Sequence, residues 1–353
     1  MSASEARVLG MAIPDPTPGP SAADGVTTLT ARTPEDLLAL APVLLGFWPE
    51  ESIVMLTVGA QRPFHARLGL PPSAEQTPAT LREVEEVLLT PARDHGARRL
   101  VLLYFTADRR AAEGVHRVLR RGCRRARVGL VTALHADGRC WSELSHPDPA
   151  ARAHTRSYDV SCHPFVVQAL VDGRLAHRTR EEMVASLEPD PAAVDAVCAA
   201  LAAAQHVDAG IPSDARAIRE AGRWVTSLVS SMVTAGGTPS DDEVARLIWV
   251  MQCRRVRDAA WSLIRREDAT AHLRFWQGVV QRTPDRLAAP PAALLGWAAW
   301  QAGDGARAWA AVDRCHRAEP SYPLAGYLGT LLQHAVPPDH WQGGFDWESG
   351  LSD

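Results

Sequence analysis

The chain has 353 residues, of which 46% are hydrophobic and 22% charged, a composition typical of globular proteins with about two domains. The formal net charge of −4 argues against a protein that uses an overall basic field to reach nucleic acid or a membrane surface. No apolar run approaches the roughly 20 residues of a membrane span, and the first residues lack the pattern of a secretory signal. We therefore expect a cytoplasmic protein without a membrane partner.

The cysteines and the basic residues indicate no particular chemistry. The cysteines are scattered without a C-x-x-C pair, which predicts neither a zinc site nor a disulfide framework. They are Cys123, Cys140, Cys162, Cys198, Cys253 and Cys315. Every basic residue is an arginine, and this bias makes many arginines ordinary surface charges rather than residues chosen for their planar shape.

The chain begins with a stretch rich in proline, so we expect residues 1–25 to form a flexible arm. An alternating, β-branched strand at 26–31 follows it. Thr33 and Pro34 then form the pattern of a helix start, an N-cap followed by proline in the first turn. That helix leads to a nearly continuous apolar strand at 52–58.

Strands and helices alternate in the next part of the chain. We expect strands at 64–70, 99–105, 127–134 and 139–144, and helices at 78–95 and 108–125. Alternation of this kind is typical of a three-layer α/β domain. Short turns join two of the strand pairs, which makes the sheet mixed rather than purely parallel. We place this mixed α/β domain at residues 26–160.

The second domain, residues 161–341, is predicted to be all-α. No convincing strand occurs beyond Val160, and Ser213 and Ser240 each precede an acidic residue, as in helix N-termini. Helices are expected at 164–172, 180–187, 191–205, 213–235, 240–253, 257–266 and 322–334.

One helix pair near the end has the spacing of a tetratricopeptide unit. Its marker positions are Leu295, Gly296, Ala308, Val312, Cys315 and Pro320. Gly296 would let the two helices approach closely. Residues 342–353 are predicted to be a frayed acidic tail. Trp341 and Trp347 fall outside the predicted core, so we expect them either to contact another chain or to pack back on the helices.

Four stretches resemble a known family. They are PEDLLALAPVLLGFWPEESIVML at 34–56 and the stretches 255–261, 289–306 and 336–341. Together they are similar to an actinobacterial family known as domain of unknown function 4192. The resemblance implies no activity, because none is assigned to that family. Members often carry a cysteine-rich stretch near the domain boundary. Residues 145–154 lack these cysteines, so no metal role is implied for this chain.

Two sets of side chains are candidates for chemistry. The catalytic candidates are Asp159, Cys162 and His163, because a thiolate beside an imidazole is an activated nucleophile. Pro164 favours the other interpretation, in which these residues start a helix. The metal candidates are His135, His146, His154 and His163. Their spacing matches no ligand signature, and solvated loop histidines are the alternative.

The segment from Arg109 to Arg127 is basic, and Glu113 is the acid that opposes it. Its candidate patch consists of Arg110, Arg117, Arg121, Arg124 and Arg125. Such a row of arginines on one helix suits nucleic acid or an acidic partner. A solvated helix face is the alternative, because no aromatic residues are interleaved.

The ends of the strands are the usual place for a ligand in an α/β sheet. A pocket in this domain would be expected near Thr57, residues 104–108 and residues 132–135. No glycine-rich phosphate loop follows a strand. Glu50 and Glu51 come before a strand, not after one, so we interpret them as a turn.

Three functional hypotheses remain. The leading one is a non-enzymatic interaction or regulatory module without a cofactor, whose partner is another protein or a second copy of the chain. The alternative is an enzyme or small-ligand-binding protein that uses the strand ends or the interdomain cleft. The third is nucleic-acid binding through the segment from Arg109 to Arg127.

Overall fold

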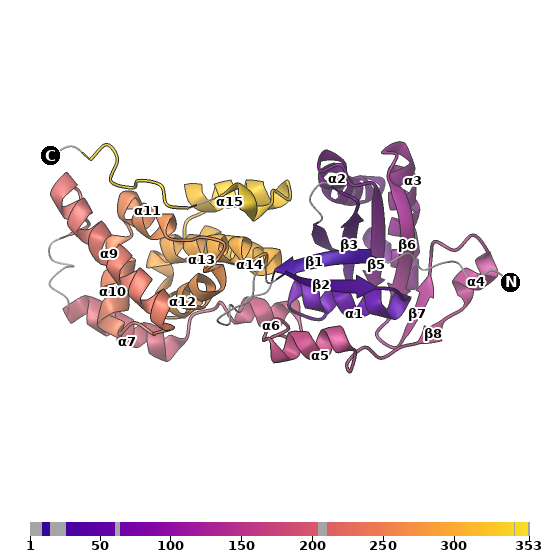
Figure 1. Ribbon diagram of the computed structural model, residues 1–353, viewed down its shortest axis with the longest axis horizontal. Coiled ribbons are helices and arrows are strands. Elements are labelled where there is room, and N and C mark those ends of the chain that lie inside the picture. Colours follow the sequence, from indigo (N-terminus) through magenta and orange to yellow (C-terminus); the bar gives the residue numbers. More distant parts are fainter. Residues whose placement is uncertain (1–8, 15–25, 61–63, 204–209, 342, 352–353) are drawn as a thin grey trace. The chain divides into compact units, whose positions relative to one another are not determined.

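The computed structural model describes residues 9–14, 26–60, 64–203, 210–341 and 343–351. The chain divides into two compact units, Met1–Glu182 and Met183–Asp353 (Figure 1). The first contains the strands, and the described part of the second consists of helices and connecting loops. Among the described residues, no helix is both long enough and apolar enough to cross a membrane.

The first unit is built on a six-stranded mixed sheet with the strand order β4-β3-β5-β6-β7-β8. The strands are β3 (Ser52–Val58), β4 (His65–Gly69), β5 (Arg99–Phe105), β6 (Gly129–Ala136), β7 (Cys140–Glu143) and β8 (Arg156–Ser157). Only the β5–β6 pair is parallel among these strands, and the other pairs are antiparallel. The predicted mixed α/β fold is therefore confirmed.

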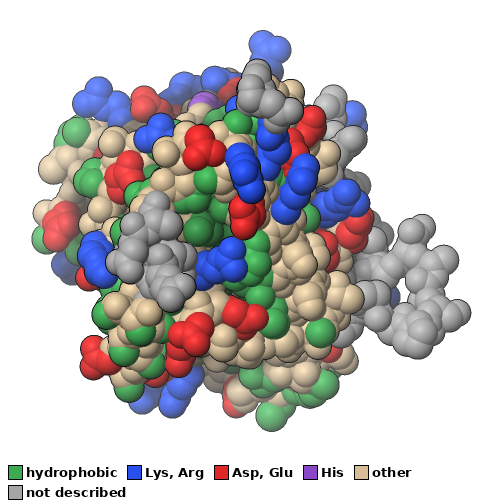
Figure 2. Space-filling view, turned by 90° about the vertical axis from the view of Figure 1, so that its left-hand side faces the viewer, with side chains coloured by type: hydrophobic (Ala, Val, Ile, Leu, Met, Phe, Trp, Pro, Cys, Tyr) green, Lys and Arg blue, Asp and Glu red, His purple; other side chains and the backbone are tan. Residues whose placement is uncertain are grey.

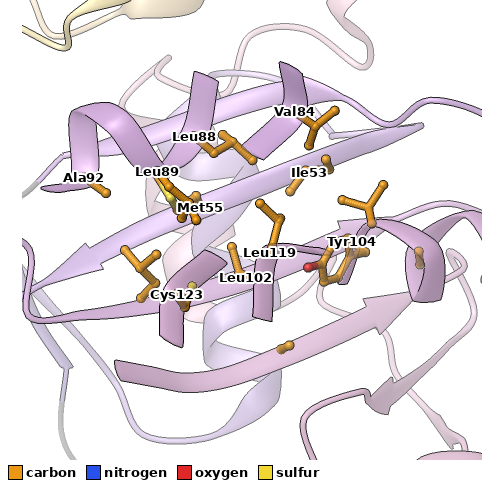
Figure 3. Packing of buried hydrophobic residues seen from close by; sticks show 14 of the residues in the cluster. Ile53, Met55, Val84, Leu88, Leu89, Ala92, Leu102, Tyr104, Leu119 and Cys123 are labelled. Atoms are coloured by element: carbon orange, nitrogen blue, oxygen red, sulfur yellow. The ribbon is translucent and has the colours of Figure 1, made fainter. Parts of the chain in front are cut away.

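Helices flank the sheet. They are α1 (Pro34–Leu45), α2 (Pro78–Asp94) and α3 (Arg109–Arg125). Side chains of α2 and α3 pack on one face of the sheet, where Ile53 and Met55 of β3 point toward them (Figure 3). Val54 and Leu56 alternate with these residues and are buried too, so the other face is also covered. The apolar sequence of β3 therefore reflects burial on both faces.

The start of α1 follows the predicted capping pattern. The Thr33 hydroxyl accepts a hydrogen bond from Asp36 N at 3.1 Å, and the Asp36 carboxylate accepts one from Thr33 N at 2.9 Å. This reciprocal capping box satisfies two backbone donors at the helix N-terminus. The helix ends at Gly46, whose φ of 75° is easily reached only by glycine.

The predicted arm is wrong for its middle part. Leu9–Pro14 forms a strand, β1, which pairs antiparallel with β2 (Val26–Ala31) in a separate two-stranded sheet. The strand predicted at 26–31 thus finds its backbone partner in β1 and not in the main sheet. Residues 1–8 and 15–25 lie outside the described residues.

The first unit extends further along the chain than the predicted boundary at residue 160. The segment after β7 contains α4 (Pro149–Ala153), α5 (Pro164–Val171) and α6 (Arg180–Ala185). His163 Nε2 lies 3.0 Å from Asp36 Oδ1, which ties the start of α5 to the start of α1. Farther on, His177 forms a bridge with Phe47. These contacts agree with the division of the chain after Glu182.

The second unit contains eight named helices in its described part. They are α7 (Pro191–Ala203), α9 (Ala215–Ala235), α10 (Asp241–Val250), α11 (Arg254–Ser262), α12 (Ala269–Gln281), α13 (Ala289–Gln301), α14 (Gly305–Ala318) and α15 (Pro323–Gln333). The predicted all-α character is confirmed. The sequence pattern did not predict α12 as a separate helix, although its N-cap residue, Asp268, is of a type favoured at helix starts.

The hairpin of α13 and α14 depends on small side chains. A Cβ atom at Gly296 would lie 2.9 Å from Leu328 Cδ2 of α15 and 3.4 Å from Ala311 Cβ of α14. The turn between the helices is closed by Asp304, whose carboxylate accepts a hydrogen bond from Arg307 N at 2.9 Å. The expected close approach at Gly296 is thus confirmed.

The predicted frayed tail is wrong for residues 343–351, because this segment packs on α9 and α11. Trp347 is buried, and its ring lies over Gly222 of α9, where a Cβ atom would collide with it. Next to it, Arg223 donates two hydrogen bonds of 3.0 Å to the Glu348 carboxylate. Phe345 packs edge-on against Trp261 of α11.

Trp341 also packs back on the helices. Its ring stacks on Trp261 with 4.7 Å between centroids, and its Nε1 donates a hydrogen bond to Ile264 O at 3.1 Å. Aromatic rings in this arrangement bury large areas while the indole N–H keeps a partner. Of the two expectations for Trp341 and Trp347, the structure shows the packing on the helices.

The tail can be tested with two variants. Trp347→Ala should lower the free energy of unfolding by about 3 kcal/mol, because a large buried ring is removed and leaves a cavity. Glu348→Gln should have a small effect, because its ion pair with Arg223 is exposed to water. Urea unfolding followed by circular dichroism measures both changes. A Trp347→Ala effect as small as that of Glu348→Gln would contradict the packing described for the tail.

Candidate functional site

The strand β4 is one of the two edge strands of the main sheet, and among the described residues no strand pairs with its outer side. Leu70 N donates to Glu51 O at 2.8 Å, and Thr57 N donates to Phe64 O at 3.1 Å. In an antiparallel ladder the hydrogen-bonded pairs alternate. The even-numbered residues of this strand therefore bond to β3, and Arg67 and Gly69 direct their N–H and C=O groups away from it.

An apolar groove of about 320 Å³ lies between this strand and α2. It is referred to below as the β4–α2 groove. Its lining residues are Leu68, Gly69, Leu70, Pro71, Thr80, Glu83, Val84 and Val87. Leu68 faces α2 because it pairs with Ile53, which points to the same face. Val87 is 48% exposed, so its side chain is accessible to a ligand in the groove.

The charge at the rim of the groove is negative. Glu83 is exposed and has no ion-pair partner among the described residues. The neighbouring Arg82 turns back along its own helix and donates to Pro78 O at 3.0 Å. Arg67 lies on the other face of the sheet, where its Nε donates to Ser52 Oγ at 2.9 Å. A ligand in the groove would therefore meet apolar walls and one carboxylate.

The second candidate region is polar and lies at the carboxyl ends of β5 and β6. Thr106 follows β5, and its hydroxyl donates to Glu51 Oε2 at 2.7 Å and accepts from Asp108 N at 3.0 Å. His135 Nε2 lies 2.9 Å from the Thr106 carbonyl oxygen, so Nε2 carries the proton of this bond. Burial lowers the pKa of His135, although the bond to Thr106 acts in the opposite direction.

Arg109 spans the same region at the start of α3. Its Nε donates to Glu113 Oε1 at 2.8 Å, its Nη1 to Ser142 Oγ at 3.1 Å and its Nη2 to Arg152 O at 2.7 Å. The guanidinium thus joins α3 to β7 and α4. These polar groups are hydrogen-bonded to one another, which is what a structural network requires.

His116 is the exception in this region. Its Nδ1 lies 3.4 Å from the Tyr104 hydroxyl, and its Nε2 is buried without a hydrogen-bond partner among the described residues. Burial, with Arg120 and Arg152 nearby, lowers the pKa of His116 to about 4. The ring is therefore neutral at pH 7.

The structure corrects the predicted ligand pocket. Thr57 lies at the opposite end of the sheet, because β3 is antiparallel to β5 and Thr57 pairs with Leu100. For the same reason Glu51, interpreted as a simple turn residue, reaches Thr106. The signal was present in the sequence. A strand–helix–strand crossover makes β4 and β5 parallel, so a hairpin of β3 and β4 leaves β3 antiparallel to β5.

The catalytic candidates do not come together. Asp159 Oδ1 accepts from Ser161 N at 2.9 Å, and Cys162 is exposed with its Sγ 3.8 Å from Ser161 Oγ. His163 instead caps α5 by accepting from Phe165 N at 3.3 Å and bonds to Asp36. Partial burial acts to raise the pKa of Asp36, but hydrogen bonds from Arg32, His163 and Thr33 together hold it below the usual value.

The four metal candidates are also separated. His135 is bonded to the Thr106 carbonyl, and His163 to Asp36. His146 accepts a hydrogen bond from Asp148 N at 3.1 Å, and His154 is exposed after α4. Among the described residues, no three His, Cys, Asp or Glu side chains gather into a group that could hold a metal ion.

The predicted basic patch lies on the outer side of α3. All five of its arginines are exposed, and Arg125 forms an ion pair with Glu85. The other members have no ion-pair partner among the described residues. They are Arg110, Arg117, Arg121 and Arg124. Like charges at i,i+4, such as Arg117 and Arg121, destabilise a helix by roughly 0.2–0.5 kcal/mol per pair.

Comparison of the sequence with known proteins gives a family match. The family model described as a domain of unknown function (DUF4192) matches residues 34–339. No curated protein and no solved structure matches the chain.

The buried His116 predicts a pH-dependent stability. Because its pKa is about 4 in the folded chain and about 6.5 when unfolded, the unfolded chain takes up a proton first as the pH falls. The stability present above pH 6.5 should therefore decrease by up to about 3 kcal/mol toward pH 4. In His116→Gln this component should vanish, whereas His154→Gln, at an exposed position, should behave like the wild type. Urea unfolding at pH 7 and pH 4.5 tests this. Equal pH dependence in all three proteins would refute it.

Proposed function

The chain belongs to the DUF4192 family, a domain of unknown function, and we propose from its geometry that it is a non-enzymatic protein-interaction module. In this proposal the module binds an extended segment of another protein along β4. The segment adds a strand to the sheet and inserts side chains into the β4–α2 groove. The supporting observation is that the open backbone edge and the apolar groove lie side by side on one strand.

Strand addition uses two complementary features. The outward N–H and C=O groups of Arg67 and Gly69 supply backbone hydrogen bonds without regard to sequence. Alternate side chains of an added strand point to the same face of the sheet as Leu68, which is the face that carries the groove. The backbone therefore gives binding, and the groove gives selectivity.

The expected affinity is modest. A buried valine or leucine side chain gains about 1.5–3 kcal/mol, and each backbone hydrogen bond adds a net 0.5–1.5 kcal/mol or so. Association costs roughly 4–15 kcal/mol in lost freedom. One or two such side chains and a few hydrogen bonds only just offset this cost, so we expect weak binding, with a dissociation constant no tighter than tens of micromolar or so. Such transient binding fits a regulatory module.

The chemistry of the groove specifies the bound segment. An apolar side chain fits against Leu68, Val84 and Val87. The carboxylate of Glu83 at the rim favours an arginine or lysine close to that apolar residue. The preferred segment is therefore extended, with an apolar residue facing the groove and a basic residue beside it.

Two further observations agree with this proposal. The polar groups at the ends of β5 and β6 are mostly bonded to one another, and the catalytic candidates lie apart. All six cysteines are free. We therefore place the protein in the cytoplasm, where thiols stay reduced, as part of the proposal.

The backbone contact can be tested at Gly69. Gly69→Pro removes an outward N–H without removing a hydrogen bond to β3, and Gly69→Ala keeps the N–H in a position with free space for a Cβ atom. Peptides selected on the wild type from a displayed random library should bind Gly69→Ala normally and Gly69→Pro at least tenfold more weakly in fluorescence anisotropy. Equal binding by both variants would contradict strand addition.

The groove can be tested at Val87. Because its side chain is half exposed, Val87→Asp should leave the fold intact while it adds a charge to the apolar wall. The selected peptides should bind this variant at least tenfold more weakly, and Glu83→Gln should reduce the preference for basic residues. Failure of the library to yield any peptide that discriminates between wild type and Val87→Asp would refute the proposed site.

A further inference from the structure

The outer side of α3 carries a row of arginines that the peptide-binding proposal does not use. Arg110, Arg117, Arg121 and Arg124 are separated by seven, four and three residues. At 3.6 residues per turn these spacings put all four on one side of the helix. Arg120 lies beside them and is exposed as well. The row is about 21 Å long at 1.5 Å per residue.

The arginines of this row are not neutralised within the chain. Glu113 bonds to Arg109, and Glu85 of α2 pairs with Arg125. Among the described residues, the five guanidinium groups of the row have no carboxylate within ion-pair distance. In contrast, arginines and carboxylates are interspersed on the face shown in Figure 2. The positive charge of α3 is therefore local, in a chain whose net charge is −4.

The helix is held in place by its other side. Ala112, Val115, Leu119 and Cys123 are buried against the sheet and α2, and Asp108 caps the N-terminus by accepting from Ala111 N at 3.0 Å. This packing keeps the arginines close together despite their mutual repulsion. A polyanion would relieve that repulsion and would meet side chains already fixed on a rigid element.

We propose that this row binds the phosphate backbone of double-stranded nucleic acid without sequence preference. Planar guanidinium groups pair with phosphate through two parallel hydrogen bonds. None of the exposed large hydrophobic side chains lies on α3, so the row lacks the apolar anchors of a protein interface. It also lacks the aromatic side chains on which unpaired bases stack.

Because the proposed binding to DNA is electrostatic, its dependence on salt concentration can be estimated. With four or five phosphates neutralised, the logarithm of the association constant should fall with the logarithm of the salt concentration with a slope of about −4. The dissociation constant of such non-specific binding is about 10⁻⁴–10⁻⁶ M at physiological salt. Binding should therefore be clear at low salt and nearly lost at high salt.

The test compares two triple variants of the full chain. One is Arg117→Gln, Arg121→Gln and Arg124→Gln in the row. The control is Arg216→Gln, Arg254→Gln and Arg274→Gln, three exposed arginines of α9, α11 and α12 for which no ion pair is formed among the described residues. Both lower the net charge by the same amount. Binding to a fluorescent 20-base-pair DNA of random sequence is measured between 50 and 200 mM salt, and circular dichroism checks the fold.

The first triple variant should bind at least tenfold more weakly at 50 mM salt, with its slope reduced to about −1 to −2, while the control stays within twofold of the wild type. An equal loss in the control, or no salt dependence in the wild type, would overturn the proposal. Polyglutamate is the second probe. If it binds the wild type as tightly as DNA and loses as much in the first variant, the row recognises acidic protein, and the assignment to nucleic acid fails.

Discussion

The antiparallel pairing of β3 with β5 is the constraint on which the first unit depends. Ser52 lies opposite Phe105 and Val58 opposite Arg99, while β5 and β6 run in the same direction. This pairing brings Glu51 to the carboxyl ends of the parallel strands and moves Thr57 to the other end. It also leaves β4 at the outer edge of the sheet, because β5 occupies the other side of β3. The edge position of β4 and the polar contacts at the ends of β5 and β6 thus both follow from the pairing of β3 with β5.

Glu51 connects these two regions. Its carbonyl oxygen accepts from Leu70 N, beside the β4–α2 groove, and its carboxylate accepts from Thr106 at the end of β5. Its φ of 40° is rare for a residue with a side chain and costs of order 1–3 kcal/mol. The bonds on both sides hold the residue in this conformation. A sharp turn at this position is needed to bring β3 into the sheet directly after the buried Phe47 and the Trp48-Pro49 pair.

Local chemistry made much of the fold predictable. Thr33 and Pro34 start α1, Gly46 ends it, and the strand at 52–58 follows, because capping, positive φ and apolar runs act over a few residues. The rest depends on partners that are distant in the sequence. A buried strand has the same apolar sequence pattern whether it pairs parallel or antiparallel with its neighbour. The antiparallel pairing of β3 with β5, which brings Glu51 to the ends of the parallel strands, could therefore not be predicted from β3 alone. The β4–α2 groove could not be predicted either, because it depends on the register of β4 against β3. Trp347 packs on Gly222 of α9. A single glycine in a helix does not indicate which distant ring will cover it, so this contact could not be predicted from the sequence.

The contact of Trp347 with Gly222 has a consequence for the order in which the second unit is assembled. The neighbouring pair, Arg223 and Glu348, is separated by 125 residues, so α9 leaves the ribosome long before the ring that covers it is made. During this interval the surface of α9 around Gly222 remains uncovered. The helices that follow must therefore pack while this side of α9 is still exposed to solvent. Translation speed over the last third of the chain therefore sets how long this surface stays uncovered.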